Sequence, residues 1–472
     1  MAAYDQKGPK LNAVIAINPK ALEIARELDA EFKAKGPRGP LHGIPVLLKD
    51  NYDTFDMPTT AGSKALVGHM AKDDAFTVAK LRAAGAIIFA KVNLAELAGS
   101  GVSISSLMGQ TYNPYDLTRT PGGSSGGTGS AIAAVFGIIG TGTDTGQSTR
   151  SPASANNGVG LRPTFGLISR DGIIPISYTQ DTAGPITHYV ADAAVMLDAM
   201  VGFDPADTST WAGIGKAPKT YTASLDKNGL KGARIGYIKQ LFGDGSFPEH
   251  KMVTDVTMKA LDDMKAAGAT VIAVDIPEIS PYLKSLKEIS ASDFERKWVM
   301  DAYFATSGPK SKYKDLADYI AHAADTHPPV FKGWKKASET KDALHDPEYL
   351  KALEAQARFR DLLVAVMDKN KLDALFYPHQ RRLVVPAAPD AEQIERNGFM
   401  GSSTGLPALT FQAGFSPVLS TAPIGVPIGI ELLGRPFSEP TLLKLAYAYE
   451  QATHHRKPPV SVPPLPGEIF TY

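Results

Sequence analysis

Residues 73–92 read DDAFTVAKLRAAGAIIFAKV, and the order of signals in this stretch indicates the class of fold. Apolar residues recur at helical spacing after an aspartate pair, Gly85 ends that pattern, and a β-branched run typical of a buried strand follows. Residues 255–275, which begin DVTMKALDDMKAAGATVIAV, repeat this order of helix, glycine and strand. Because helices and buried strands alternate, we predict an α/β fold in which a sheet is sandwiched between helices.

The second half of the chain contains a different kind of segment. Residues 283–372 carry long helical patterns and few strand signals, so we predict a helical segment laid over one side of the sheet. Strand patterns resume at 373–378 (DALFYP), 407–414 (PALTFQAG) and 426–434 (VPIGIELLG), and a final helix is predicted at 439–453.

Charge and composition exclude several classes of function. The 472 residues include 49 Lys+Arg and 49 Asp+Glu, so no net field favours nucleic acid or an anionic membrane as a partner. The longest apolar stretch, residues 131–140, is too short to span a bilayer, which needs about 20 residues. Cysteine is absent, which excludes disulfides and thiolate zinc sites. Because no signal-peptide pattern stands at the start, the cytoplasm is the default expectation for its location.

Two glycine-rich loops contain the candidate nucleophiles. They are PGGSSGG at 121–127 and GTDTGQSTR at 142–150. The first loop fits the G-x-S-x-G pattern of an α/β-hydrolase at both Ser124 and Ser125, but that motif has to follow a buried strand. The residues before it, QTYNPYDLTRTP, are polar and interrupted by proline. An esterase of the α/β-hydrolase type is therefore the weaker hypothesis, and neither loop has the spacing of a phosphate-binding motif.

A lysine can supply the base that these loops lack. The apolar segment GIPVLLKDN, residues 43–51, leads into Lys49 at the end of a predicted strand. Burial disfavours the charged form of a lysine, so a lysine at the end of a buried strand can be neutral near pH 7. A neutral lysine is a general base.

The combination of this lysine with the two loops resembles the amidase signature family. The resemblance rests on Lys49, GGSSGG and GTDTGQSTR, and it continues through GVGLRPTFGLISRDGIIPIS, QDTAGPI and VADAAVMLDAMVG up to residue 202. It is weaker in GLKGARIGY (229–237), STGLPALTFQAG and GVPIGIELLGRPFSEPTLLKLAYAYEQAT near the C-terminus. It covers most of the chain, although residues 283–395 match only loosely. It implies one large domain, residues 1–472, with a central mixed β-sheet covered by helices on both faces. It further implies a catalytic core over 43–202 and a mainly helical substrate-pocket segment over 283–395.

The resemblance also implies roles for the polar residues of the loops. Ser148 would be the nucleophile, Ser124 a bridging serine on a cis peptide, and Lys49 the base at the end of a proton relay. The oxyanion hole would consist of the backbone N–H groups of Thr145, Gly146, Gln147 and Ser148. Supporting residues would be Ser125, Asp144 and Arg150, the last two through hydrogen bonds or an ion pair.

Two departures from the family pattern affect these expectations. Gln147 stands where the family usually has glycine; its backbone N–H is retained, and its side chain points either away from the substrate or toward it. The beginning of the sequence resembles the second helix of the family's usual start, so we expect an N-terminal helical stretch to be absent, either naturally or by truncation.

These features predict an amidohydrolase that cleaves the C–N bond of a small, uncharged aryl or alkyl amide, with esters or carbamates as further substrates. The rival hypothesis is an amidotransferase subunit that supplies ammonia to a partner enzyme. No cofactor is expected, and no metal either, because the pairs His322/His327 and His454/His455 lack a third ligand at suitable spacing. We expect a monomer or homodimer that acts on a small molecule.

Overall fold

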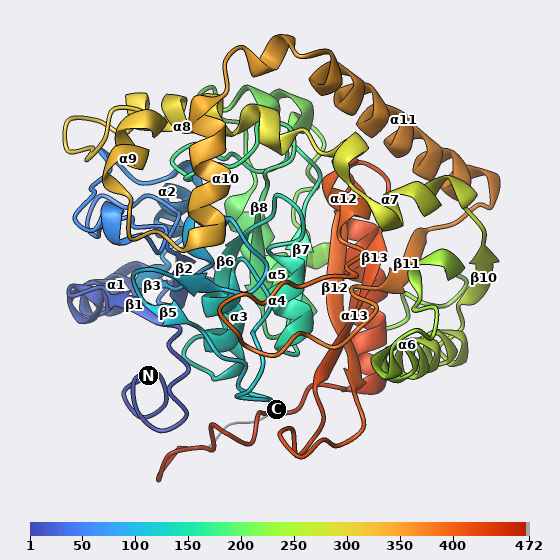
Figure 1. The fold of residues 1–472 in the computed structure, drawn as a ribbon. Coiled ribbons are helices and arrows are strands. Elements are labelled where there is room, and N and C mark those ends of the chain that lie inside the picture. The colour runs from blue at the N-terminus through green and yellow to red at the C-terminus, as the bar shows by residue number, and fades with distance from the viewer. Residues whose placement is uncertain (469–472) are drawn as a thin grey trace.

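A β-sheet of eleven strands forms the centre of the structure, a computed structural model that describes residues 1–468 (Figure 1). The described residues form thirteen strands, eleven in this sheet and two in a separate small one: β1 (Val14–Ile17), β2 (Pro45–Lys49), β3 (Ile87–Val92), β4 (Ile104–Ser105), β5 (Gly109–Gln110), β6 (Ile139–Thr143), β7 (Val159–Arg162), β8 (Ala183–Thr187), β9 (Arg234–Ile238), β10 (Thr270–Val274), β11 (Ala374–Pro378), β12 (Ala408–Phe415) and β13 (Pro427–Leu433). The order in the large sheet is β1-β3-β2-β6-β8-β7-β12-β13-β11-β9-β10, and β4 pairs with β5 apart from it. β2 runs parallel to β3 and β6, and β9 runs parallel to β10 and β11. The remaining pairs of the large sheet are antiparallel, so the sheet is mixed.

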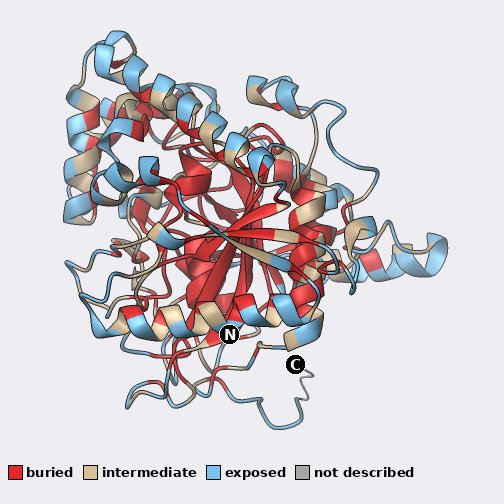
Figure 2. Cartoon of the chain, turned by 90° about the vertical axis from the view of Figure 1, so that its right-hand side faces the viewer, coloured by how far each residue is buried: buried red, intermediate tan, exposed pale blue. Residues whose placement is uncertain are grey.

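Residues 1–468 form thirteen α-helices, several of which cover the two faces of this sheet. They are α1 (Ala21–Lys35), α2 (Phe76–Ala83), α3 (Gly126–Ala133), α4 (Arg150–Ala155), α5 (Val190–Met200), α6 (Pro248–Ala266), α7 (Ser280–Lys284), α8 (Ser292–Thr306), α9 (Leu316–His322), α10 (Pro328–Glu339), α11 (Pro347–Lys369), α12 (Phe399–Ser402) and α13 (Glu439–Thr453). On one face of the sheet, the apolar residues of α2, α5, α6 and α13 form a core with the strands. On the opposite face, α3, α4 and α11 pack on the strands. Figure 2 shows the result: buried strands in the middle, and helices around them whose outer sides are exposed.

The composition of the strands follows from this double cover. In β11, Ala374 and Phe376 belong to the core under α6, whereas Leu375 and Tyr377 belong to the core under α11. Successive side chains of a strand point to opposite faces, so a strand covered on both sides has to be apolar throughout. For this reason the central strands appear in the sequence as continuous apolar runs.

The predicted elements are present. The helix and strand expected in residues 73–92 are α2 and β3, and those expected in 255–275 are α6 and β10. The three later strand patterns correspond to β11, β12 and β13, and the predicted final helix is α13. The prediction of one domain with a mixed sheet between two layers of helices is confirmed.

The helical segment predicted over 283–372 divides into two parts (Figure 1). α11 packs on the sheet, with Leu363 against Leu375 of β11 in one core. α8, α9 and α10 instead pack on loops that follow β2 and β3, where Trp334 and Phe304 share a core with Leu97. The expectation of a single layer over the sheet therefore holds for α11 alone, because the apolar faces of α8–α10 match apolar loop residues that the sequence pattern did not reveal.

Candidate active site

Lys49 is the last residue of β2, and its side chain is fully buried. Its Nζ lies 2.8 Å from Ser124 Oγ and 2.7 Å from Thr143 Oγ1. Burial lowers the pKa of Lys49 to about 7, against the opposing effect of the negative charges of Asp144 and Asp181. Near pH 7 a large fraction of Lys49 is therefore neutral and able to accept a proton from Ser124.

Ser124 stands two residues before α3, and the peptide bond between Gly123 and Ser124 is cis. The glycines around it are required by close packing. A Cβ on Gly123 would lie 2.6 Å from the carbonyl carbon of Gly101, and a Cβ on Gly127 would lie 2.1 Å from the carbonyl oxygen of Asn93. The residues between β5 and this loop contribute no strand to either sheet, so the loop is not the strand-to-helix turn of an α/β-hydrolase.

Ser148 lies in the turn between β6 and α4, where it is partly buried. Its carbonyl oxygen accepts a hydrogen bond from the backbone N–H of Ser125 at 3.3 Å, which joins the two glycine-rich loops. Within residues 1–468, the backbone N–H groups of four successive turn residues donate to no protein acceptor; these are Thr145, Gly146, Gln147 and Ser148. Free amides on one tight turn are suitable donors for an oxyanion.

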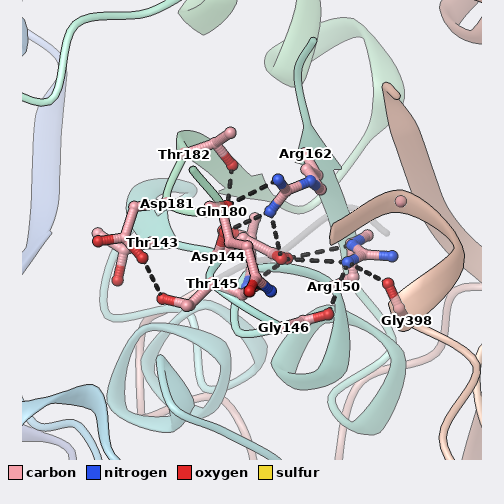
Figure 3. Close-up of polar contacts among 12 residues, drawn as sticks. Thr143, Asp144, Thr145, Gly146, Arg150, Arg162, Gln180, Asp181, Thr182 and Gly398 are labelled. Atoms are coloured by element: carbon pink, nitrogen blue, oxygen red, sulfur yellow. Dashed lines mark hydrogen bonds and ion pairs between the residues drawn. The ribbon is translucent and has the colours of Figure 1, made fainter. Parts of the chain in front are cut away.

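A buried network of charges supports this turn (Figure 3). Asp144 Oδ1 lies 3.1 Å from Arg150 Nη2 and 3.0 Å from Arg162 Nη1, and all three side chains are fully buried. Arg150 also forms an ion pair with Glu431 of β13 and donates to the carbonyl oxygen of Gly146 at 3.0 Å. Burial by itself would raise the pKa of Asp144, but the two arginines hold that pKa well below its usual value. Asp144 is therefore ionised, and the network fixes both ends of the turn.

Three residues of this region were not among the predicted site residues: Thr143, Arg162 and Glu431. Thr143 and Arg162 lie inside motifs that carried the family resemblance, but nothing in the sequence indicated that they contact Lys49 and Asp144. Glu431 interrupts the apolar run VPIGIELLG, and it lies 281 residues from its partner Arg150. An acidic residue in a fully buried strand needs a buried cation, and this was the signal that could have identified it.

Two cavities border the turn. One, of about 390 Å³, is lined by Thr143, Thr145 and Tyr303 among others. The other, of about 810 Å³, is lined on the side of the turn by Thr145, Gly146 and Gln147, and on the opposite side by Arg396. Thr145 lines both, so the turn separates two spaces in which parts of a substrate could bind. The side chain of Gln147 is directed into the wall of the second cavity, where its amide meets the guanidinium of Arg396.

A metal centre and a membrane span were also considered. Among residues 1–468, no group of three or more His, Asp or Glu side chains is arranged to hold a metal ion. No helix in this part of the chain combines the length and the apolar character needed to cross a bilayer.

Comparison with known proteins identifies the family. The family model described as Amidase matches residues 1–443. The chain belongs to the amidase family. This amidase is 33% identical over 471 residues to the glutamyl-tRNA(Gln) amidotransferase subunit of Methanosarcina mazei, covering 96% of the chain and 93% of the relative. It is 36% identical over 481 residues to a probable amidase of Arabidopsis thaliana, covering 97% of the chain and 86% of the relative.

Solved structures give the same result. The peptide amidase from Stenotrophomonas maltophilia superimposes with a TM-score of 0.86 at 38% sequence identity, covering 97% of this amidase and 92% of that chain. The glutamyl-tRNA(Gln) amidotransferase subunit from Thermotoga maritima gives a TM-score of 0.69 at 25% identity, covering 95% and 92%. The predicted amidase signature fold and the predicted class of enzyme, one that acts on carbon–nitrogen bonds, are thereby confirmed.

Proposed function

We propose that this amidase hydrolyses the C–N bond of a small aryl or alkyl amide through an acyl-enzyme on Ser148, with esters and carbamates as further substrates. One observation carries the proposal. Lys49 is fully buried, its pKa is lowered to about 7 by that burial, and its Nζ lies 2.8 Å from Ser124 Oγ. A neutral lysine in hydrogen-bond contact with a serine is a base that can work without histidine.

The proposed chemistry uses the chain's own groups in two half-reactions. Ser148 Oγ attacks the carbonyl carbon while its proton passes to Ser124 Oγ and the proton of Ser124 passes to Lys49 Nζ. The carbonyl oxygen becomes an oxyanion that accepts hydrogen bonds from the free amides of the turn. The proton then returns along the relay to the leaving nitrogen, and the C–N bond breaks. Water, activated by the same relay, releases the acid from Ser148.

The supporting residues act through position. Asp144 and Arg150 make the ion pair that fixes the turn, and Arg150 binds the carbonyl oxygen of Gly146 between the oxyanion donors. Ser125 joins the turn to the Ser124 loop through the hydrogen bond of its N–H to Ser148. The donors are thus held in place before the substrate arrives, which is the condition for electrostatic stabilisation of an oxyanion.

A second candidate follows from the similarity to amidotransferase subunits. In that case Ser148 would attack the side-chain amide of glutamine to form a glutamyl-enzyme, and the released ammonia would be used by a partner enzyme. If the purified chain alone hydrolyses a simple aryl amide, and a partner enzyme that uses ammonia does not stimulate this activity, the result favours the hydrolase. Glutamine as the only amide cleaved favours the amidotransferase.

The nucleophile is tested by covalent labelling. A fluorophosphonate should modify Ser148, located by mass spectrometry of the digested protein, and the label should abolish hydrolysis of a p-nitroanilide. The Arg150→Lys variant is assayed in parallel, because it keeps the positive charge but loses the planar guanidinium that binds two groups at once. Labelling at Ser124 or Ser125 would show that the wrong serine has been assigned.

A further inference from the structure

One cation beside the proposed catalytic turn has no partner charge. Arg396 lines the larger cavity next to Gln147, and within residues 1–468 its guanidinium forms no ion pair. Its side-chain partner is the amide oxygen of Gln147, which lies 2.6 Å from Nε, 2.9 Å from Nη1 and 3.1 Å from Nη2 in the amide orientation that satisfies both groups. A guanidinium has five N–H donors, so even when this oxygen faces all three nitrogens, the second N–H of each Nη has no acceptor within residues 1–468.

Arg396 remains charged at neutral pH. Its burial lowers the pKa to about 10, against the opposing effect of the negative charges of Glu392 and Asp144. Neither carboxylate makes an ion pair with it. A partly buried cation without a counter-ion is unfavourable in the empty site, and a bound anion would remove that penalty.

The guanidinium lies between the two glycine-rich loops. A Cβ on Gly101 would lie 2.3 Å from Arg396 Nη1, so Gly101 is the surface on which the guanidinium rests. Gly101 itself packs on Gly123, the residue before Ser124. On its other side Arg396 meets Gln147, the residue before Ser148. Its free donors are therefore near the place where the scissile carbonyl has to bind.

The other cations of this cavity do not share these properties. Arg381 lies 3.9 Å from Glu395, and Lys284 stands at the exposed rim. Arg396 is thus the cation at the catalytic end of the cavity. In the sequence it is a single arginine in QIERNGF, next to a glutamate, and such a pattern is typical of an ordinary surface residue.

We propose that Arg396 binds a carboxylate of the substrate, so that the enzyme acts on amides that carry a carboxylate a few bonds from the scissile carbonyl. This inference rests on the proposed function and replaces the uncharged substrate expected from the sequence. Guanidinium and carboxylate match in a pair of parallel N–H···O hydrogen bonds, which fixes orientation as well as charge. Gln147, whose amide oxygen contacts the guanidinium, orients it for this contact.

Two matched substrate pairs test the inference and show on which side of the scissile bond the carboxylate lies. Succinyl p-nitroanilide is compared with butyryl p-nitroanilide for a carboxylate on the acyl side, and 4-acetamidobenzoate with acetanilide for one on the amine side. A hydrogen-bonded pair between charged groups predicts that native enzyme prefers the anionic member of one pair roughly 10- to 100-fold in kcat/KM. Arg396→Met should bring that ratio close to one, whereas the control Lys284→Met should retain it. Ratios near one in native enzyme for both pairs would overturn the inference.

A binding measurement separates this inference from the proposed mechanism. Ser148→Ala should bind the anionic member of the preferred pair at least about tenfold more tightly than the neutral member, measured by calorimetry, and Ser148→Ala/Arg396→Met should not. Binding of the anion no tighter than that of its neutral partner would refute the carboxylate site even if Ser148 is the nucleophile. A binding preference that depends on Arg396, together with no labelling of Ser148, would refute the mechanism and leave the carboxylate site standing.

Discussion

Replacement of Lys49 by methionine separates the two tasks of the proposed relay, which are to accept a proton and to return it. Methionine is similar in length, but it leaves Ser124 Oγ and Thr143 Oγ1 without the Nζ atom that lies 2.8 and 2.7 Å away. An amide nitrogen leaves only after it has received a proton, whereas p-nitrophenolate leaves without one. General acid–base groups contribute roughly 10²- to 10⁴-fold, so we expect kcat/KM to fall about 10⁴-fold for an anilide and about 10²-fold for a p-nitrophenyl ester.

The quantity to measure is the ratio of amidase to esterase kcat/KM for native enzyme and Lys49→Met. It should fall about 100-fold, equivalent to about 2.7 kcal/mol of differential transition-state stabilisation. Ser148→Ala is the control, because it removes the attacking atom and should abolish both activities. In native enzyme, kcat/KM for the anilide should rise with pH through an apparent pKa near 7, since the neutral form of Lys49 is the base. Equal losses for amide and ester would mean that Lys49 does not deliver a proton to the leaving group, and the relay would be wrong.

Four further outcomes are expected. Lys49→Met should increase the free energy of unfolding, and the increase should be largest at pH 7 and below. Between pH 7 and 10.5 this increase should shrink by about 1.4 kcal/mol per pH unit, because in that range Lys49 of the unfolded native chain keeps a proton that the buried Lys49 has lost; urea titrations at several pH values check it. Gln147→Gly should change the relative kcat/KM among substrates while the smallest amide stays within about tenfold, or 1.4 kcal/mol, and a uniform collapse would place Gln147 in the catalytic machinery. Asp144→Ala should lower the free energy of unfolding by about 3–5 kcal/mol, because two buried arginines lose their shared counter-ion; a loss below 1 kcal/mol in urea denaturation would contradict a buried network. Activity should survive EDTA, and a loss that zinc reverses would reveal a metal requirement.

Local signals in the sequence were sufficient for the helices and strands that were predicted and for the position of Lys49 at the end of a buried strand. The strand that ends at Lys49 is apolar throughout, and a lysine at its end has to be buried when both faces of the sheet are covered. The glycines around Ser124 were recognised for the same reason, since neighbouring backbone leaves no space for a Cβ on Gly123 or Gly127. In these cases the signal itself is local, although the neighbours that require it, such as Gly101 and Asn93, lie about 20 to 35 residues away.

Contacts between distant parts of the chain were not predictable in this way. Glu431 pairs with Arg150 because α4, which Arg150 begins, packs on β13, and this packing is not visible in local sequence pattern. Arg396 is the same kind of case. Its neighbours in sequence predict a solvated arginine, and only the packing of the 393–399 segment against Gly101 and Gln147 turns it toward the site.

The contacts of Arg150 have a consequence for how the enzyme is made. Arg150 starts the helix after the turn, yet it donates to the carbonyl oxygen of Gly398 and pairs with Glu431, both near the far end of the chain. During synthesis the glycine-rich loops leave the ribosome long before these partners exist. An N-terminal fragment that contains every residue of the proposed relay therefore keeps the Asp144–Arg150 pair but lacks Glu431 and the Gly398 carbonyl, two of the groups that hold the Arg150 guanidinium. Competence for catalysis should appear only when nearly the whole chain has been translated and β13 has joined the sheet.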